Sequence, residues 1–191
     1  MIIATMCSLN LISQTSTTDP GVVINGVKWA TRNVDDIGKF ASSPESSGKF
    51  YQWNRKKAWT TIGESVSGWD YSSTPTGTSW TRTNDPCPAG WRVPTKSELQ
   101  KLIDAGSTWT TRNGIKGCLF GTAPNQIFLP AVGYRGGQGG TLRDVTTGHY
   151  WSKTHDVYNE EVAYLLLFWS HSVSVSDYLR VLGYCVRCVA E

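Results

Sequence analysis

The most informative part of this 191-residue chain is residues 162–184, which read VAYLLLFWSHSVSVSDYLRVLGY. Apolar residues alternate along it, with Leu166 and Phe168 in a first run and Val173 and Val175 in a second. Successive side chains of a β-strand point to opposite faces, so this period of two predicts strands with one buried face. The residues between them are Leu165, Leu167, Trp169, Ser172, Ser174 and Ser176. A purely structural strand would carry polar residues at all of these positions, so outward Leu and Trp side chains indicate a surface that meets a partner.

Other β-type runs lie on both sides of a central region. Residues 22–34 contain two short runs joined by Asn25-Gly26, and this dipeptide is the strongest local signal for a hairpin because it accepts positive φ. Further along, residues 118–121 and 126–130 also read as short strands.

One helix is clearly predicted in the central region. Thr95 as the N-cap residue and Glu98 three positions later form a capping box, and Gly106 can end the helix. The apolar residues that share one face of this helix are Leu99, Leu102 and Ile103.

The composition indicates a loop-rich fold held by buried aromatic residues. The chain has nine Trp and nineteen Gly but only 17% charged residues. Residues 60–83 are rich in Ser, Thr and Gly yet carry Trp69, Tyr71 and Trp80, which predicts an ordered surface excursion rather than a linker. The glycine run at residues 133–140 predicts a flexible loop, and no following Lys-Ser/Thr helix makes it a phosphate-binding motif. We therefore expect one α+β domain with short mixed or antiparallel strands, one or two helices and long loops.

The charge distribution argues against nucleic acid as a partner. The formal net charge is +3, but residues 154–191 hold two Lys/Arg against five Asp/Glu, and the one basic run is Arg55-Lys56-Lys57. Phosphate binding needs clustered cations that displace counterions.

No stretch approaches the roughly 20 apolar residues needed to span a bilayer. No Lys or Arg precedes Lys28, so the charged region of a secretory signal is not visible. The apolar start, residues 1–4, could instead be a first strand.

Five cysteines leave at least one thiol unpaired within the chain. Cys185 and Cys188 lie in residues 183–189, which read as a strand, and at about 3.3 Å per residue such a pair lies about 10 Å apart on opposite faces. Because a disulfide bridges at most about 7 Å between Cα atoms, a mutual bond is not expected. No second close Cys pair completes a zinc site. In an oxidising compartment, the preferred long-range disulfide is Cys87–Cys188.

Six short motifs occur in order along the chain. They are residues 29–33 (WATRN), 85–95 (DPCPAGWRVPT), 129–131 (LPA), 133–135 (GYR), 150–152 (YWS) and 183–189 (GYCVRCV). With these motifs the chain resembles the Fibrobacter succinogenes major paralogous domain family over about residues 22 to 189. That family is similar to a branch of the C-type-lectin-like fold that includes the formylglycine-generating enzymes. The resemblance implies a C-type-lectin-like domain at residues 22–191, preceded by an N-terminal strand or extension at residues 1–21.

Several members of this family resemble the variable proteins of diversity-generating retroelements, in which adenine-directed mutagenesis randomises Asn codons near the C-terminus. This resemblance implies a variable region at residues 154–182 that binds an unknown protein or glycan on a cell or phage surface. The framework would be Tyr150, Trp151, Ser152, Ala163, Leu166, Phe168, Val173, Arg180, Gly183, Tyr184 and Arg187. The diversified positions would be His155, Asp156, Tyr158, Asn159, Leu165, Leu167, His171, Ser172, Ser174, Ser176, Asp177, Tyr178, Leu179, Val181 and Leu182. Trp169, Glu160 and Glu161 would have fixed codons, and of these three only Trp169 would join the diversified positions as a ligand-binding residue. Cys185 departs from the family, where a small polar residue is usual.

Two other functions remain open. One is a surface adhesin with fixed recognition, and the other is an enzyme of the formylglycine-generating type. The enzyme needs a paired-cysteine site upstream of the terminal strand, whereas Cys185 and Cys188 lie inside that strand. The histidines, His149, His155 and His171, have no carboxylate or nucleophile at a motif spacing, so we predict no catalytic residue, metal site or cofactor. Calcium is not implied either, because no acidic cluster has enough ligands.

Overall fold

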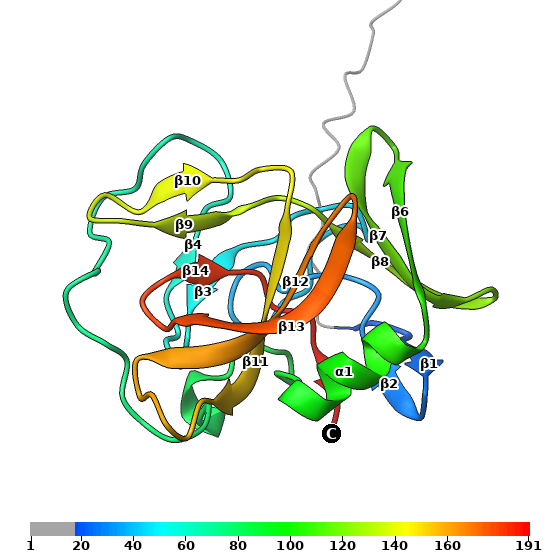
Figure 1. The fold of residues 1–191 in the computed structure, drawn as a ribbon, viewed down its shortest axis with the longest axis horizontal. Helices are drawn as coiled ribbons and strands as arrows, with labels where there is room; N and C mark the ends of the chain where they lie inside the picture. Colours follow the sequence, from blue (N-terminus) through cyan, green and yellow to red (C-terminus); the bar gives the residue numbers. More distant parts are fainter. Residues whose placement is uncertain (1–17) are drawn as a thin grey trace, which may run out of the picture.

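The computed structural model describes residues 18–191, which form four small sheets and one α-helix. Figure 1 shows the helix beside the sheet that residues 148–179 form. The predicted strand at residues 1–4 lies outside the described residues. Within them the strands are short and every pairing between named strands is antiparallel. The α+β class with short strands is therefore confirmed. None of the helices in this part of the chain is long and apolar enough to cross a membrane.

The first sheet joins the two ends of the described chain. Its strand order is β1 (Val22–Ile24), β2 (Val27–Trp29), β15 (Val189–Ala190) and β5 (Trp91–Arg92). Asn25 and Gly26 connect β1 to β2 with φ values of 45° and 76°, so the predicted hairpin is confirmed. Val189 pairs with Trp29, which brings the terminal strands together.

The second sheet corrects two expectations. Its order is β10 (Thr141–Arg143), β9 (Tyr134–Gly136), β14 (Gly183–Tyr184), β3 (Phe50–Gln52) and β4 (Ala58–Trp59). The glycine run at residues 133–140 is not simply a flexible loop, because part of it forms β9 and Gly140 donates a hydrogen bond to the Gly137 carbonyl. Residues 183–189 are not one continuous strand either. Residues 183–184 form β14 and residue 189 begins β15 in a different sheet, so Cys185 and Cys188 lie between two strands and not inside one.

The third and fourth sheets each contain three strands. The third is β11 (Gly148–His155), β12 (Val162–Trp169) and β13 (Ser172–Leu179), and the fourth is β6 (Ser107–Arg112), β7 (Ile115–Thr122) and β8 (Asn125–Pro130). The strands predicted at residues 118–121 and 126–130 are confirmed inside β7 and β8.

Helix α1 (Lys96–Asp104) begins and ends where the sequence predicts. The Thr95 hydroxyl accepts the Glu98 N–H and the Glu98 carboxylate accepts the Thr95 N–H, so the capping box is complete. Gly106 has a φ of +86° and donates to the Ile103 carbonyl, which ends the helix. A short 3-10 helix, η1 (Arg82–Asn84), begins at the end of the long excursion of residues 60–83. Trp69 and Trp80 anchor that excursion, since both are buried.

Two clusters of buried side chains lie on opposite faces of the β11–β12–β13 sheet. The first core cluster includes Tyr150, Leu166 and Phe168 together with Leu99 and Leu102 of α1. The second includes Trp151, Ala163, Leu165, Leu167, Leu182 and Tyr184 together with Cys87 and Cys188. The central strand β12 is therefore covered on both faces.

The Cys87–Cys188 disulfide is present, with 6.1 Å between the two Cα atoms. It joins the segment before β5 to the segment before β15. Cys118 and Cys185 are free and buried. Burial raises the pKa of the Cys118 thiol to about 11 and that of Cys185 to about 12, so both are protonated near neutral pH.

Candidate recognition surface

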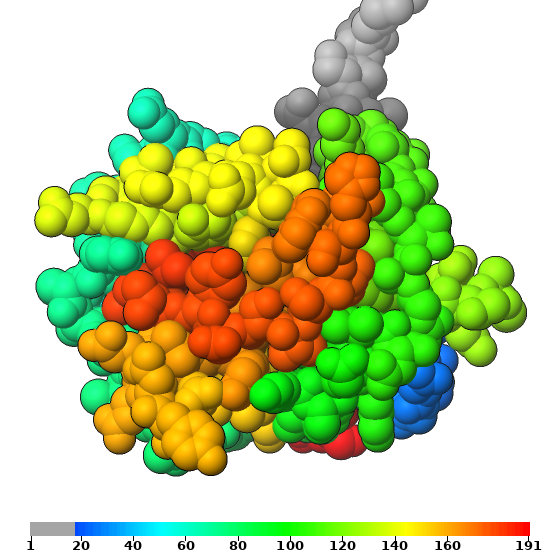
Figure 2. Space-filling view, in the orientation of Figure 1, coloured from blue at the N-terminus to red at the C-terminus, as the bar shows by residue number. Residues whose placement is uncertain are grey.

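Strand β13 lies at the edge of its sheet. It pairs with β12 on one side, and no other strand of residues 18–191 pairs with its outer side. Figure 2 shows β13 and the residues after it crossing the middle of one face of the molecule, between β9 and β10 on one side and α1 and residues 155–161 on the other. Ser172, Ser174 and Ser176 are half-buried, and the Ser174 and Ser176 hydroxyls lie 3.1 Å apart.

The serines share a face with the apolar residues of β12. Ser174 pairs with Leu167 and Ser176 pairs with Leu165, so these four side chains point to the same side of the sheet. Leu165 is fully buried and Leu167 is 9% exposed. The expectation that both leucines face outward is wrong. An edge strand shows its side chains to solvent, but the central strand beside it is covered by the second core cluster.

The end of β13 is the most open part of this strand. Asp177, Tyr178 and Leu179 are exposed, with exposed fractions of 42% for Tyr178 and 37% for Leu179. Tyr178 stands edge-on to the buried ring of Tyr184, with 6.4 Å between their centroids. A supported aromatic side chain of this kind offers a large contact area at low entropic cost.

The exposed run stops at Leu179, earlier than expected. Val181 and Leu182 are 7% and 8% exposed, so their assignment to the recognition surface is wrong. The Leu182 N–H donates to the Leu179 carbonyl, which turns the chain towards the core. A Cβ placed on Gly136 would lie 2.7 Å from the Leu182 side chain, which shows how closely Leu182 packs on β9.

The loop between β11 and β12 presents a second exposed tyrosine. Tyr158 is 96% exposed, and Asn159 next to it is exposed. The loop is held by the Asp156 carboxylate, which accepts the N–H groups of Tyr158 and Asn159 at 2.7 and 3.0 Å and the hydroxyl of Tyr164. These hydrogen bonds, the one from Tyr164 first, lower the pKa of Asp156. The half-buried Asp156 therefore organises this turn.

The Tyr158 loop and the end of β13 are neighbours. The Arg180 N–H donates to the Glu161 carbonyl at 2.8 Å, and Leu179 pairs with Val162 at the end of the loop. The segments that carry Tyr158 and Tyr178 are separated in the sequence but adjoin each other in the fold.

The opposite end of β12 and β13 holds the turn from Trp169 to Ser172. Trp169 is 39% exposed and His171 is exposed. Both border a hollow of about 380 Å³ that also meets Trp109 and the buried Cys118. Trp109 was missed by the sequence reasoning, because only the tertiary fold places β6 beside this turn.

A buried aromatic group lies beneath the centre of the surface. His149 stacks on Tyr184 with 5.0 Å between ring centroids and an interplanar angle of 16°, and Tyr134 packs against both rings. Burial lowers the pKa of His149 to about 4, so this imidazole is neutral near pH 7. The Tyr184 hydroxyl is buried and has no hydrogen-bond partner among the described residues.

The framework residues implied by the resemblance are buried, with one exception. Val173 is half-buried. The buried ones are Tyr150, Trp151, Ser152, Ala163, Leu166, Phe168, Arg180, Gly183, Tyr184 and Arg187.

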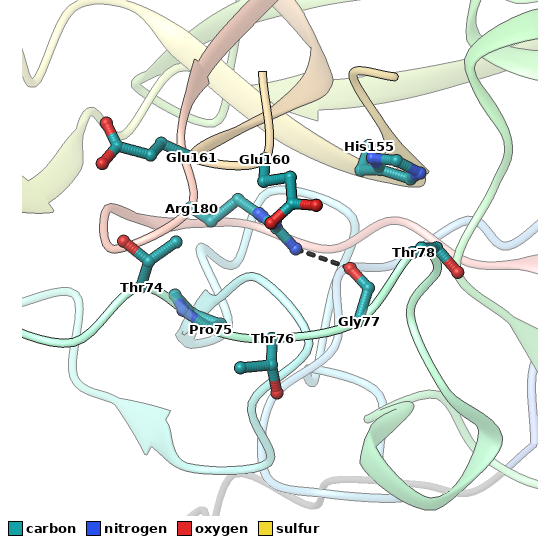
Figure 3. A pocket seen from close by; sticks show the side chains of 9 residues that line it. All are labelled: Thr74, Pro75, Thr76, Gly77, Thr78, His155, Glu160, Glu161 and Arg180. Atoms are coloured by element: carbon teal, nitrogen blue, oxygen red, sulfur yellow. Dashed lines mark hydrogen bonds between the residues drawn. The ribbon is translucent and has the colours of Figure 1, made fainter. Parts of the chain in front are cut away.

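A second hollow, of about 350 Å³, lies beside the Tyr158 loop (Figure 3). His155 and Glu160 border it on one side, and residues 74–78 border it on the other, with the Arg180 side chain between them. Of these residues the sequence reasoning named only His155 as a ligand-binding residue. Residue 77 lies 103 positions before Arg180, and no local pattern signals that they meet.

The three histidines occupy different environments: His149 in the aromatic stack, His155 beside the hollow of Figure 3 and His171 in the β12–β13 turn. Within residues 18–191, no group of three or more His, Cys, Asp or Glu side chains is placed to hold a metal ion.

The chain has no match among known protein families, curated proteins or solved structures.

Proposed function

We propose that this chain is a ligand-binding protein with a C-type-lectin-like fold, and that its C-terminal region recognises a protein or glycan on a cell or phage surface. As in the variable proteins of diversity-generating retroelements, a constant lining would hold a sheet whose outer side chains vary. The pairing of β2 with β15, which brings the N-terminal and C-terminal strands together, supports this C-type-lectin-like fold.

The division of residues 154–182 into buried and exposed side chains carries the proposal. The implied framework is buried except for half-buried Val173, while a set of implied variable positions reaches solvent. The proposed recognition set is His155, Asp156, Tyr158, Asn159, Trp169, His171, Ser172, Ser174, Ser176, Asp177, Tyr178 and Leu179. Strand β13 supports the residues from Ser172 to Leu179, and the Asp156 carboxylate supports the Tyr158 loop. Such support limits the entropy lost on binding.

Leu165, Leu167, Val181 and Leu182 are left out of that set because they are buried. Free variation at such positions would create cavities or overpacking, each of which costs about 1 to 5 kcal/mol. We assign these four residues to the constant lining.

Binding experiments test the surface directly. Fluorescently labelled protein, applied to a glycan array and to intact bacterial cells, is compared with the Tyr178→Ala/Leu179→Ala double variant. The double variant should lose binding, because it removes the two most exposed apolar side chains at the end of β13. A Val23→Ala variant is the matched control, since Val23 is 55% exposed in the terminal sheet. Equal binding by wild type and double variant would contradict the proposal.

A surface adhesin with fixed recognition would use the same side chains, so sequencing the neighbouring DNA separates the two proposals. A nearby reverse transcriptase gene and a near-identical repeat with adenines at the codons of the recognition set, Trp169 excepted, support diversification. Their absence favours fixed adhesion. For the third proposal, a formylglycine-generating enzyme, Cys87 is bonded to Cys188 while Cys118 and Cys185 are buried, so residues 18–191 hold no accessible cysteine pair. Those two observations favour the binding proposals.

A further inference from the structure

Three arginines are almost fully buried, and they differ sharply in how their N–H groups are used. Arg135 donates to the carbonyl groups of residues 60, 62, 63, 64 and 140. Arg187 donates twice to the Asn33 side chain and once each to the carbonyls of residues 30 and 128. The side chain of Arg180, a residue that is 3% exposed, makes one hydrogen bond, from Nη1 to the Gly77 carbonyl at 2.7 Å.

The remaining donors of Arg180 have no acceptor in the described part of the chain. Its Nε is buried without a partner, and no carboxylate of residues 18–191 lies within ion-pair distance of the guanidinium. Burial lowers the pKa of Arg180, and Glu160 opposes this only from longer range. A guanidinium has five N–H donors, and each one that is buried without an acceptor costs free energy. Arg180 is therefore a buried cation with few hydrogen-bond acceptors, whereas Arg135 and Arg187 have acceptors for most of their N–H groups.

This cation lies at the wall of the hollow in Figure 3. The volume of about 350 Å³ is sufficient for a small ligand, and the wall includes Thr74, Thr76, Thr78 and His155. Glu160 and Glu161 stand on the side opposite residues 74–78, where they can accept hydrogen bonds.

We infer that this hollow is a binding site for a small carboxylate ligand that also carries a hydrogen-bond donor: the carboxylate binds Arg180 and the donor binds Glu160. A carboxylate matches the guanidinium fork better than any neutral acceptor does. Two carboxylates against one cation make the wall net negative, so a simple anion is disfavoured and a ligand with an ammonium or several hydroxyl groups is favoured. The threonine hydroxyls can form further hydrogen bonds with a ligand that carries an ammonium group or with one that carries hydroxyl groups.

Two classes of small molecule carry both a carboxylate and a hydrogen-bond donor, namely α-amino acids and acidic sugars. An amino acid presents an ammonium group to Glu160, whereas a uronic acid presents hydroxyl groups. The inference rests on the proposed function insofar as His155 belongs both to this hollow and to the recognition set.

The test uses the full chain and isothermal titration with L-alanine and with glucuronate. The methyl ester of each serves as the control, because it keeps the shape and loses the negative charge. We expect at least one carboxylate to bind about tenfold or more tightly than its ester, the loss typical of one charge-assisted hydrogen bond. Arg180→Lys should weaken binding by about the same factor, since the fork is lost. The Nε–H signal of Arg180 should shift in NMR spectra when the ligand is added.

Two variants separate the sources and the sites. If the ammonium group of alanine contacts Glu160, Glu160→Gln should abolish any preference for alanine over glucuronate. The same variant should leave glucuronate binding within about twofold of the wild type, because an amide still accepts hydrogen bonds. Val23→Ala, in the terminal sheet, should leave the binding of both probes unchanged. The probes are measured separately from the glycan array and the cells, so a failure of the surface proposal is distinguishable from a failure here. Binding of neither carboxylate, equal binding of acid and ester, or full binding by a folded Arg180→Lys variant would overturn the inference. If that variant does not fold, the acid and ester comparison and the NMR shift decide the matter in the wild-type protein.

Discussion

The guanidinium carbon of Arg180 lies 4.7 Å from the centroid of the Trp53 ring, so an under-bonded cation rests on a buried aromatic face. Trp53 is fully buried, and its indole N–H donates a hydrogen bond to the Ser152 carbonyl at 2.9 Å. The cation–π contact offsets part of the cost of burying Arg180. It does not replace the missing acceptors.

Replacing Arg180 by Met should therefore change the free energy of unfolding by less than about 1 kcal/mol, because the lost contacts are offset by removal of an under-bonded buried charge. Urea unfolding followed by circular dichroism measures this change. The matched comparison is Arg187→Met, which strips partners from Asn33, Ala30 and Phe128. That variant should lose about 3 to 5 kcal/mol. Similar losses for the two variants would show that Arg180 stabilises the fold as Arg187 does.

Alanine substitutions on the two sides of the third sheet should separate core from surface. Leu165→Ala should lower the free energy of unfolding by about 2 to 5 kcal/mol, because it leaves a cavity between β12 and the second core cluster. Tyr178→Ala and Leu179→Ala should each cost about 1 kcal/mol or less, since both side chains are exposed. Thermal unfolding of the three variants checks the order. A loss at Leu179 as large as that at Leu165 would mean that the end of β13 belongs to the core.

Breaking the Cys87–Cys188 disulfide should strongly destabilise the protein. The bond spans 101 residues, and a loop of this length corresponds to about 4 to 5 kcal/mol of chain entropy in the unfolded state. Urea unfolding of a Cys87→Ala/Cys188→Ala variant measures the loss. Dithiothreitol should destabilise the wild type and have no further effect on the variant. If the wild type is as stable with reductant as without it, the disulfide does not hold the fold together.

His149 should make stability depend on pH below neutrality. Burial lowers its pKa from an ordinary 6.5 to about 4 in the folded protein, so the unfolded state binds a proton first as the pH falls. The contribution is fully present above about pH 6.5 and is lost as the pH falls to about 4, with a maximum near 3 kcal/mol. Urea unfolding between these pH values measures the slope. His149→Phe should flatten it and His171→Phe should keep it, and an unchanged slope in His149→Phe would assign the effect to other groups.

Local sequence signals predicted local structure well. The Asn25-Gly26 hairpin and the Thr95–Glu98 capping box form as expected, because their hydrogen bonds close within a few residues. The disulfide between Cys87 and Cys188 was also anticipated. The long excursion at residues 60–83 is anchored by Trp69 and Trp80, as its aromatic content indicated.

The pattern of alternation was less reliable for deciding what reaches solvent. Leu165 and Ser176 pair across adjacent strands and point to the same side, yet one is buried and the other is half-exposed. A period of two assigns side chains to two faces of a sheet but does not tell whether a strand is central or at an edge.

By itself, the sequence determined the α+β class, the helix, the hairpins and the two faces of the C-terminal strands, because these depend on contacts between near neighbours in the chain. Only the tertiary structure decided that β12 is covered on both faces, that Val181 and Leu182 turn inward, and that Arg180 meets residues 74–78. Those features depend on which distant segments pack together, and packing between distant segments leaves no fixed spacing in the sequence.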